Sequence, residues 1–244
     1  MSLLLGAIAL SVAGSLGGLV AAALLLLLPA RTRAMLVPNL VSYAVGALLG
    51  VALMALLPEA LAVAPASRVF GTLLAGILLF FVLEKLVLWR HCHTDECAVH
   101  GTSATLVLVG GAVHNFVDGA MIGAALVTAV PLGISAAIAV AAHEVPQEIG
   151  DFAVLLHAGY SRRKALGLNI LCALASLLGA AGAVLLVGIL PNILPYALAI
   201  ASSSFLYVAM SDLIPDLHSS TQGGLAAVRQ VILVGLGMTM VLLL

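Results

Sequence analysis

Two polar stretches, HNFVDG at His114 to Gly119 and HEVPQEIGD at His143 to Asp151, interrupt neighbouring apolar segments of this chain. Each apolar segment is long enough to cross a lipid bilayer, and each polar stretch falls near its middle. An ionisable side chain at the bilayer centre costs roughly 2.5–3.5 kcal/mol on insertion scales, so such side chains are rare there without a function. The two stretches therefore indicate a membrane-embedded fold with a functional site inside it.

The composition points to a membrane protein over the whole chain. Of the 244 residues, 64% are hydrophobic and only 8% are charged, whereas soluble domains average about 25% charged residues. The composition therefore predicts a polytopic, all-α membrane protein. The formal net charge of −1 gives no basis for binding nucleic acid. No Lys or Arg precedes the first apolar run, which favours a first span over a cleaved signal peptide.

Eight apolar segments reach the roughly 20 residues that a transmembrane helix needs. Short breaks separate them. The tight breaks at Pro131 and Pro191 predict antiparallel helical hairpins. The first break is expected between Pro29 and Pro38. The eight predicted transmembrane helices cover residues 3–29, 38–63, 69–89, 103–129, 132–157, 165–190, 193–217 and 225–244.

The basic residues predict the orientation in the membrane. Apart from Arg68, every Lys and Arg falls on the same side of the predicted spans. Since Lys and Arg concentrate in cytoplasmic loops, this side is expected to be cytoplasmic and both termini are expected to lie outside. The residues on the shared side are Arg31, Arg33, Lys85, Arg90, Arg162, Arg163, Lys164 and Arg229.

A short internal similarity relates the first three predicted spans to the last three. Residues 55–59 read ALLPE in the second span, and residues 212–216 read DLIPD in the seventh. With two helices between the copies, this repeat predicts a 3+2+3 arrangement with an inverted repeat of spans 1–3 and 6–8. Inverted repeats around a midplane site are a common plan of transporters. Glycine pairs four residues apart favour close helix packing at Gly14/Gly18, Gly46/Gly50 and Gly119/Gly123.

The polar side chains of the fourth and fifth spans fall at one depth. His114 and His143 each lie about eleven residues into their spans, which is roughly 16 Å at 1.5 Å per residue. Asp118 shares a helical face with His114, and Asn115 is rotated by about 100° from that face. If the two helices face each other, these groups converge near the bilayer centre.

The fifth span adds two polar stripes around a proline. His143 and Gln147 share one stripe, and Glu144 and Glu148 share the neighbouring one. Pro146 removes a backbone hydrogen bond and is expected to kink the helix and free a carbonyl at this depth. A lone intramembrane histidine is more often a hydrogen-bonded packing residue. Imidazoles, carboxylates and amides together instead indicate a site for ions such as Zn(II), Fe(II), Mn(II), Cd(II) and Co(II).

HNFVDG with HEVPQE on the next span resembles the paired signature of the ZIP (Zrt/Irt-like protein) family of metal transporters, in a prokaryotic type, whose patterns are HNFxDG and HExPHE. The resemblance implies a single transmembrane transport domain over residues 1–244 of the cell (inner) membrane. Its substrate would be a divalent transition metal moving toward the cytoplasm, with zinc foremost and cadmium, iron and manganese also carried, and it would need no organic cofactor. The implied metal ligands are His114, Asn115, Asp118, His143, Glu144 and Gln147.

Two positions qualify this resemblance. Gln147 stands where HExPHE has its second histidine, and an amide oxygen is a weaker and harder ligand than an imidazole. The replacement is expected to weaken zinc selectivity and full occupancy of a two-metal centre. The family also draws a ligand from the sixth span, where Ser176 is the best-placed residue.

The polar loop at about residues 91–102 is expected in the cytoplasm. Its stretch HCHTDECAVH resembles the His-rich loop of ZIP proteins, interpreted as a metal-receiving segment, although an ordinary polar loop is the alternative. Cys92 and Cys97 are not expected to form a disulfide in a reducing compartment. Cys172 stands alone in an apolar span and is expected to be a packing residue.

Two other functions fit part of the sequence. HEVPQ resembles the first half of HExxH, in which two histidines bind zinc and the glutamate acts as a base. Gln147 replaces the second histidine and Pro146 disturbs the helical geometry, so we do not expect an intramembrane zinc metalloprotease or any other enzyme. A non-transporting metal sensor would hold the same ligands without flux. The expected partners are the metal ion and the lipid bilayer, and the small-residue faces are compatible with a homodimer.

Overall fold

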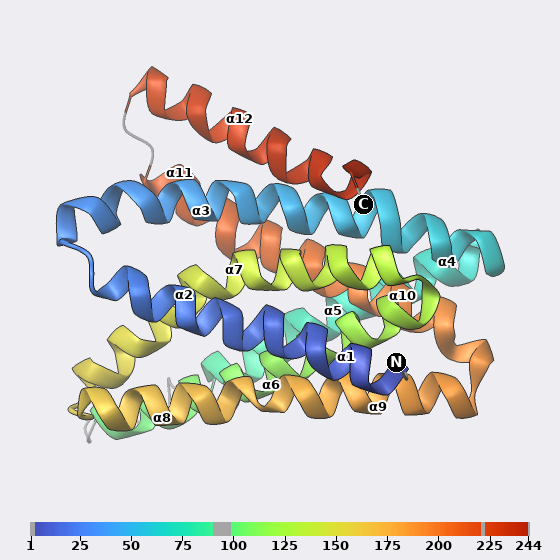
Figure 1. Cartoon of the computed structure of the whole chain (residues 1–244), viewed down its shortest axis with the longest axis horizontal. Helices are drawn as coiled ribbons and strands as arrows, with labels where there is room; N and C mark the ends of the chain where they lie inside the picture. Colours follow the sequence, from blue (N-terminus) through green and yellow to red (C-terminus); the bar gives the residue numbers. More distant parts are fainter. Residues whose placement is uncertain (1–2, 90–98, 221–222, 244) are drawn as a thin grey trace.

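The computed structural model describes residues 3–89, 99–220 and 223–243, and these residues form a bundle of helices with no strand (Figure 1). Six segments of the described chain are long and apolar enough to cross a membrane. The protein is therefore an all-α, multi-pass membrane protein. The six segments are Leu3–Leu26, Ala30–Val63, Ala66–Lys85, Val107–Thr128, Arg162–Ile189 and Pro191–Ser219.

The described residues of the predicted spans are mostly helical, with short non-helical ends such as residues 27–29, and several spans contain a π-helical turn. The elements in chain order are α1 (Leu3–Ser11), η1 (Val12–Leu16), α2 (Gly17–Leu26), α3 (Ala30–Gly50), η2 (Val51–Leu56), α4 (Leu57–Val63), α5 (Ala66–Trp89), α6 (Val99–Thr128), α7 (Val130–His157), α8 (Arg162–Ala173), α9 (Ala175–Ile189), η3 (Pro191–Ile193), α10 (Leu194–Tyr207), η4 (Val208–Leu213), α11 (Ile214–Ser220), α12 (Gly224–Met240) and η5 (Val241–Leu243). Of these, η1, η2 and η4 are π-helices, which are often found at functional sites.

Two long helices, α7 and α12, are not among the six apolar segments. α7 carries Glu144, Glu148 and Asp151 in its C-terminal half, and α12 is only 17 residues long. α12 lies along α3 at one edge of the bundle, whereas α7 runs through its middle (Figure 1).

The expected break between Pro29 and Pro38 was wrong in its extent. α3 begins at Ala30 and continues through Pro38 as one helix. Pro38 has no N–H and so frees the Ala34 carbonyl, four residues earlier. Membrane helices tolerate a proline where their surroundings satisfy such a carbonyl. Arg33 in the first turn of α3 donates to the Leu26 carbonyl at 2.9 Å, and so caps the end of α2.

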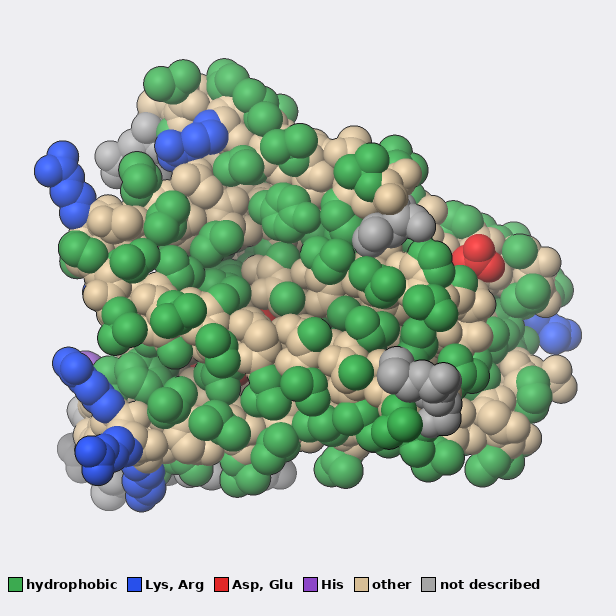
Figure 2. All heavy atoms as spheres, viewed as in Figure 1, with side chains coloured by type: hydrophobic (Ala, Val, Ile, Leu, Met, Phe, Trp, Pro, Cys, Tyr) green, Lys and Arg blue, Asp and Glu red, His purple; other side chains and the backbone are tan. Residues whose placement is uncertain are grey.

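Apolar side chains divide between a packed interior and an outward face. The main core joins α3, η2, α6, α7 and α10 through fully buried residues such as Leu48, Ile122 and Phe205. Outward side chains such as Leu74 on α5 and Leu178 on α9 are large, apolar and exposed. Figure 2 shows such side chains over most of one face, with Lys and Arg gathered mainly at one end. This distribution suits a surface that contacts lipid.

Helix pairs approach closely where glycines remove the side chain. A Cβ atom at Gly119 of α6 would overlap the Ser176 carbonyl of α9, and one at Gly179 would overlap the Phe116 carbonyl in return. The same reciprocal fit joins Gly46 of α3 to Gly237 of α12. The close packing expected at Gly46 and Gly119 is confirmed.

The predicted metal-capturing loop lies outside the described residues over positions 90–98. The expectations for Cys92 and Cys97 therefore stay predictions. Cys172 is a buried free thiol whose Sγ donates to the Leu108 carbonyl at 3.3 Å, as a packing residue can.

Candidate metal centre

α6 contributes the first two polar groups of the site. His114 and Asp118 lie one helical turn apart, so their side chains leave the same face. The His114 Nε2 and Asp118 Oδ2 atoms are 3.2 Å apart. The expected pairing of these two residues is confirmed.

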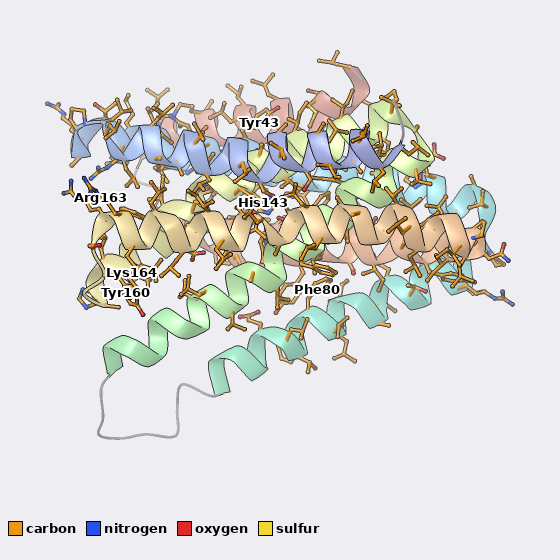
Figure 3. All side chains as sticks on the ribbon, turned by 60° about the horizontal axis from the view of Figure 1, so that its bottom comes forward. Tyr43, Phe80, His143, Tyr160, Arg163 and Lys164 are labelled. Carbon is orange, nitrogen blue, oxygen red and sulfur yellow. The ribbon has the colours of Figure 1, made fainter. Side chains whose placement is uncertain are left out.

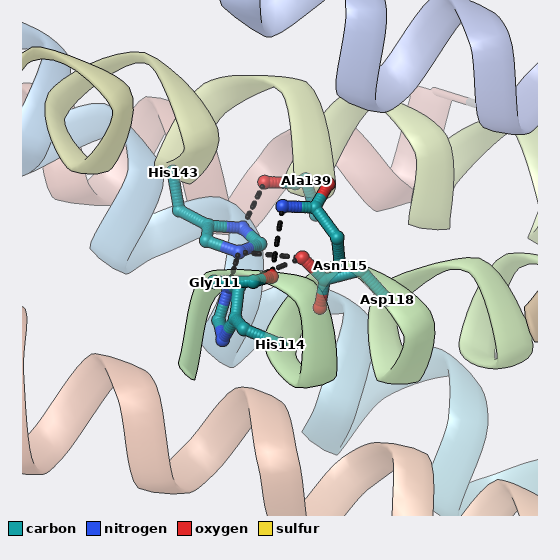
Figure 4. Close-up of polar contacts among 6 residues, drawn as sticks. All are labelled: Gly111, His114, Asn115, Asp118, Ala139 and His143. Atoms are coloured by element: carbon teal, nitrogen blue, oxygen red, sulfur yellow. Dashed lines mark hydrogen bonds and ion pairs between the residues drawn. The ribbon is translucent and has the colours of Figure 1, made fainter. Parts of the chain in front are cut away.

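α7 brings His143 against this pair (Figure 4). Its Nε2 atom is 3.1 Å from the Nε2 atom of His114 and 3.0 Å from the Oδ2 atom of Asp118. The two imidazole rings meet edge to face, with centroids 5.3 Å apart. The predicted convergence of the two helices is therefore confirmed for these three side chains.

The hydrogen bond of His143 to its own helix determines the tautomer of the neutral imidazole ring. The Nδ1 atom lies 3.0 Å from the Ala139 carbonyl oxygen, which can only accept, so Nδ1 carries the hydrogen. In the neutral ring the Nε2 atom then presents a lone pair to the Asp118 carboxylate. Two lone pairs at this distance repel unless a proton or a metal ion lies between them. A histidine held by a backbone carbonyl in this way is the usual outer arrangement around a bound metal.

Glu144 completes a compact group of four. One ligand atom each from His114, Asp118, His143 and Glu144 can be chosen so that all lie within 4.8 Å of one another. Both carboxylate oxygens of Glu144 are buried and have no hydrogen-bond partner among the described residues. Ligand atoms around a tetrahedral zinc ion are about 3.3 Å apart when the bonds are 2.0–2.1 Å. The separations among the first three residues are already close to this value.

The side-chain amide of Asn115 lies beside these four residues. Its Nδ2 atom donates to the Gly111 carbonyl at 3.1 Å, which orients the amide. Its Oδ1 atom is buried and has no hydrogen-bond partner in the part of the chain that the structure describes. Burying an acceptor atom without a donor costs free energy. Amide and carboxylate oxygens both bind metal cations, so a cation could satisfy Asn115 and Glu144 together.

The site is closed to solvent except at one residue. Asn115, Asp118, His143 and Glu144 are each at most 1% exposed, whereas the His114 side chain is 20% exposed. In the described part of the chain, no Lys or Arg forms an ion pair with these acids. The carboxylates are therefore balanced by the two histidines or by an ion.

Gln147 and Ser176 stay predictions as ligands. Gln147 is partly exposed one turn beyond His143 on α7, and no hydrogen bond joins it to the four residues in the described structure. The Ser176 hydroxyl donates to the Ala173 carbonyl at 2.7 Å and accepts from the Ser11 hydroxyl at 2.9 Å. It is engaged in joining α1 to α9.

Two buried polar residues were not expected at the site, Ser15 in the π-helix η1 and Asn169 on α8. Within the described residues, the Ser15 Oγ and Asn169 Nδ2 atoms have no hydrogen-bond partner. The available signal was a single amide in a long apolar segment, which points to a functional position only weakly.

The chain is similar to known proteins over most of its length. The sequence profile described as ZIP Zinc transporter matches residues 89–244. Human zinc transporter ZIP4 is 45% identical over 112 residues, which are 46% of this chain and 17% of ZIP4. Zinc transporter ZIP13 of Pongo abelii is 33% identical over 194 residues, 73% of this chain and 58% of that protein. The chain thus spans well under two thirds of these relatives.

The family match extends over more than half of the chain and includes both polar helices, α6 and α7. Its members are membrane transporters and not enzymes, which excludes the metalloprotease alternative. The chain belongs to the ZIP zinc transporter family.

Proposed function

We propose that this chain carries divalent transition-metal ions, zinc foremost, across a membrane through the centre on α6 and α7. The observation that carries the proposal is the Nε2 atom of His143, held 3.0 Å from the Oδ2 atom of Asp118 in a buried site. A cation between these atoms relieves their repulsion. Its proposed ligands are His114, Asn115, Asp118, His143, Glu144 and Gln147.

The similar proteins support zinc as the foremost substrate. ZIP4 and ZIP13 are named as zinc transporters, and this chain shares part of their length. The nitrogen and oxygen donors of the centre also suit cadmium, iron and manganese. We propose no organic cofactor, because the metal ion itself is the cargo.

We propose that α7 and α12 also cross the membrane, which gives eight spans in a 3+2+3 arrangement and a single transport domain over residues 1–244. The pairing of helices supports an inverted repeat. α3 packs on α12 as α10 packs on α5, and α2 packs on α7 as α9 packs on α6. In addition, the π-helices η2 and η4 directly precede α4 and α11, whose second residues are Pro58 and Pro215.

We propose that the protein lies in the inner membrane of the cell. The basic end of the bundle faces the cytoplasm, and both termini lie outside. Tyr160, Arg163 and Lys164 lie at one end of the molecule, far from His143 in its middle (Figure 3). The ion would move from the opposite end toward this one. A homodimer through the small-residue faces stays a prediction.

Ion flux into proteoliposomes tests the proposed function. Vesicles holding the purified chain are expected to take up Zn²⁺ faster than protein-free vesicles, with smaller rates for Cd²⁺, Fe²⁺ and Mn²⁺ and none for Mg²⁺. Magnesium is the control because it requires octahedral oxygen ligands and keeps much of its hydration shell. Stoichiometric zinc binding without flux would contradict transport and favour a metal sensor.

Gln147 offers a test of ion preference. Gln147→His supplies a second imidazole one turn after His143, and imidazole favours zinc over manganese more strongly than an amide oxygen does. The ratio of Zn²⁺ to Mn²⁺ uptake is therefore expected to rise in the variant. Parallel uptake assays with both ions measure this ratio. An unchanged ratio would show that position 147 does not contact the ion.

A further inference from the structure

Unpartnered polar groups continue beyond the metal centre, on the next turns of α7 and on α8. Glu148 and Asn169 are each 3% exposed. The Oε2 atom of Glu148 and the Nδ2 atom of Asn169 have no hydrogen-bond partner within the described structure. The two side chains approach each other where α7 packs on α8. A buried carboxylate oxygen without a partner is unfavourable and calls for a donor or a cation, whereas the Asn169 nitrogen can only donate, so the Glu148 side chain is the group that points to a cation.

Asp151 adds a second carboxylate to the same region. It lies three residues after Glu148, close to one helical turn further along α7. Its Oδ2 atom is 3.4 Å from the position that a Cβ atom at Gly111 of α6 would occupy. The carboxylate therefore points into the space between α6 and α7. Over the described residues, no ion pair neutralises Glu148 or Asp151.

The position of these residues along the bundle suggests their role. Glu148 follows His143 by five residues, which is about 7.5 Å along the axis of α7. Asn169 follows Ser161, the N-cap residue of α8, by eight residues, which is about 12 Å along the axis of α8. Both therefore lie between the buried centre and the end of the bundle that holds Arg163 and Lys164 (Figure 3).

We propose that Glu148 and Asp151, beside Asn169, form a second station for the divalent cation, between the metal centre and the basic end. The station offers two carboxylates, which are harder ligands than imidazole and hold zinc less tightly. With two charged oxygen ligands and no imidazole, the station is the looser of the two sites, as an ion in transit requires. This inference rests on the proposed function.

Zinc binding and uptake by Glu148→Gln test the station. The amide keeps the shape of the side chain and removes its charge. Equilibrium dialysis of the purified full chain against Zn²⁺ alone is expected to show one bound ion fewer than in wild type. Uptake into proteoliposomes is expected to fall about tenfold or more, since affinity at carboxylate sites follows the number of charged ligands. Asn39→Ala is the matched control, because its Oδ1 atom is also unpartnered but lies on α3.

Moving the negative charge from position 148 to position 169 distinguishes a role of Glu148 in ion binding from a role in folding. Adding Asn169→Asp to Glu148→Gln returns one negative charge to the station, and is expected to restore the lost ion and most of the uptake. Wild-type binding and uptake in Glu148→Gln, or no recovery in the double variant, would overturn the station. The proposed function fails by a different result, namely His143→Ala with unchanged binding and uptake.

Discussion

Replacing His143 by alanine is expected to lower zinc uptake by more than about 100-fold, because even outer-shell changes at metal sites cost 10–100-fold. The variant removes the imidazole that touches both His114 and Asp118. Glu144→Ala is expected to have a comparable effect, since it removes the carboxylate whose oxygens have no other partner. Initial rates in proteoliposomes measure both variants.

Both variants are expected to be expressed and inserted normally. His143 bonds its own helix and the centre, so its loss leaves the other helix contacts in place. His157→Ala, at the end of the same helix, is the matched control and is expected to keep its uptake. Near-normal uptake in either His143→Ala or Glu144→Ala would remove that residue from the site.

Gly119→Ala is expected to destabilise the protein by about 3 kcal/mol, the upper end of the usual range for overpacking. The added methyl group would overlap the backbone carbonyl of Ser176, which cannot rotate away as a side chain can. α6 would be displaced from α9, and with it His114 and Asp118. Thermal unfolding in detergent measures the change.

Gly110→Ala is the matched control on the same helix. An added Cβ at Gly110 meets no atom within 4 Å, and alanine favours a helix over glycine by about 1 kcal/mol. The control is therefore expected to be as stable as wild type or slightly more stable. Equal stability of Gly119→Ala and Gly110→Ala would contradict the close approach of α6 and α9.

The sequence predicted the helices and the central side chains well because both depend on strong local signals. Long apolar runs require helices in lipid, where every backbone group must be satisfied within its own segment. His114 and Asp118 share a face by helical spacing alone, and the equal depth of His143 required only the tight connection at Pro131. Pro38 was misjudged because a proline often ends a soluble helix, whereas a membrane helix can continue through it.

The remaining parts of the site depend on contacts between distant segments. Ser176 was expected near the ion, but its hydroxyl bonds Ser11, which lies 165 residues earlier. No spacing rule reports this pairing. Asn169 was passed over because one amide in an apolar segment is a weak signal, and its approach to Glu148 depends on how α8 packs on α7.

X-ray absorption at the zinc edge tests most directly whether the ion binds at the proposed centre. The sample is the full chain carrying Cys92→Ser and Cys97→Ser, loaded with less than one Zn²⁺ per chain. We predict nitrogen and oxygen ligands at about 2.0–2.1 Å and outer-shell scattering from imidazole that weakens in His143→Ala. A sulfur shell at about 2.3 Å, or imidazole scattering unchanged in the variant, would contradict the account.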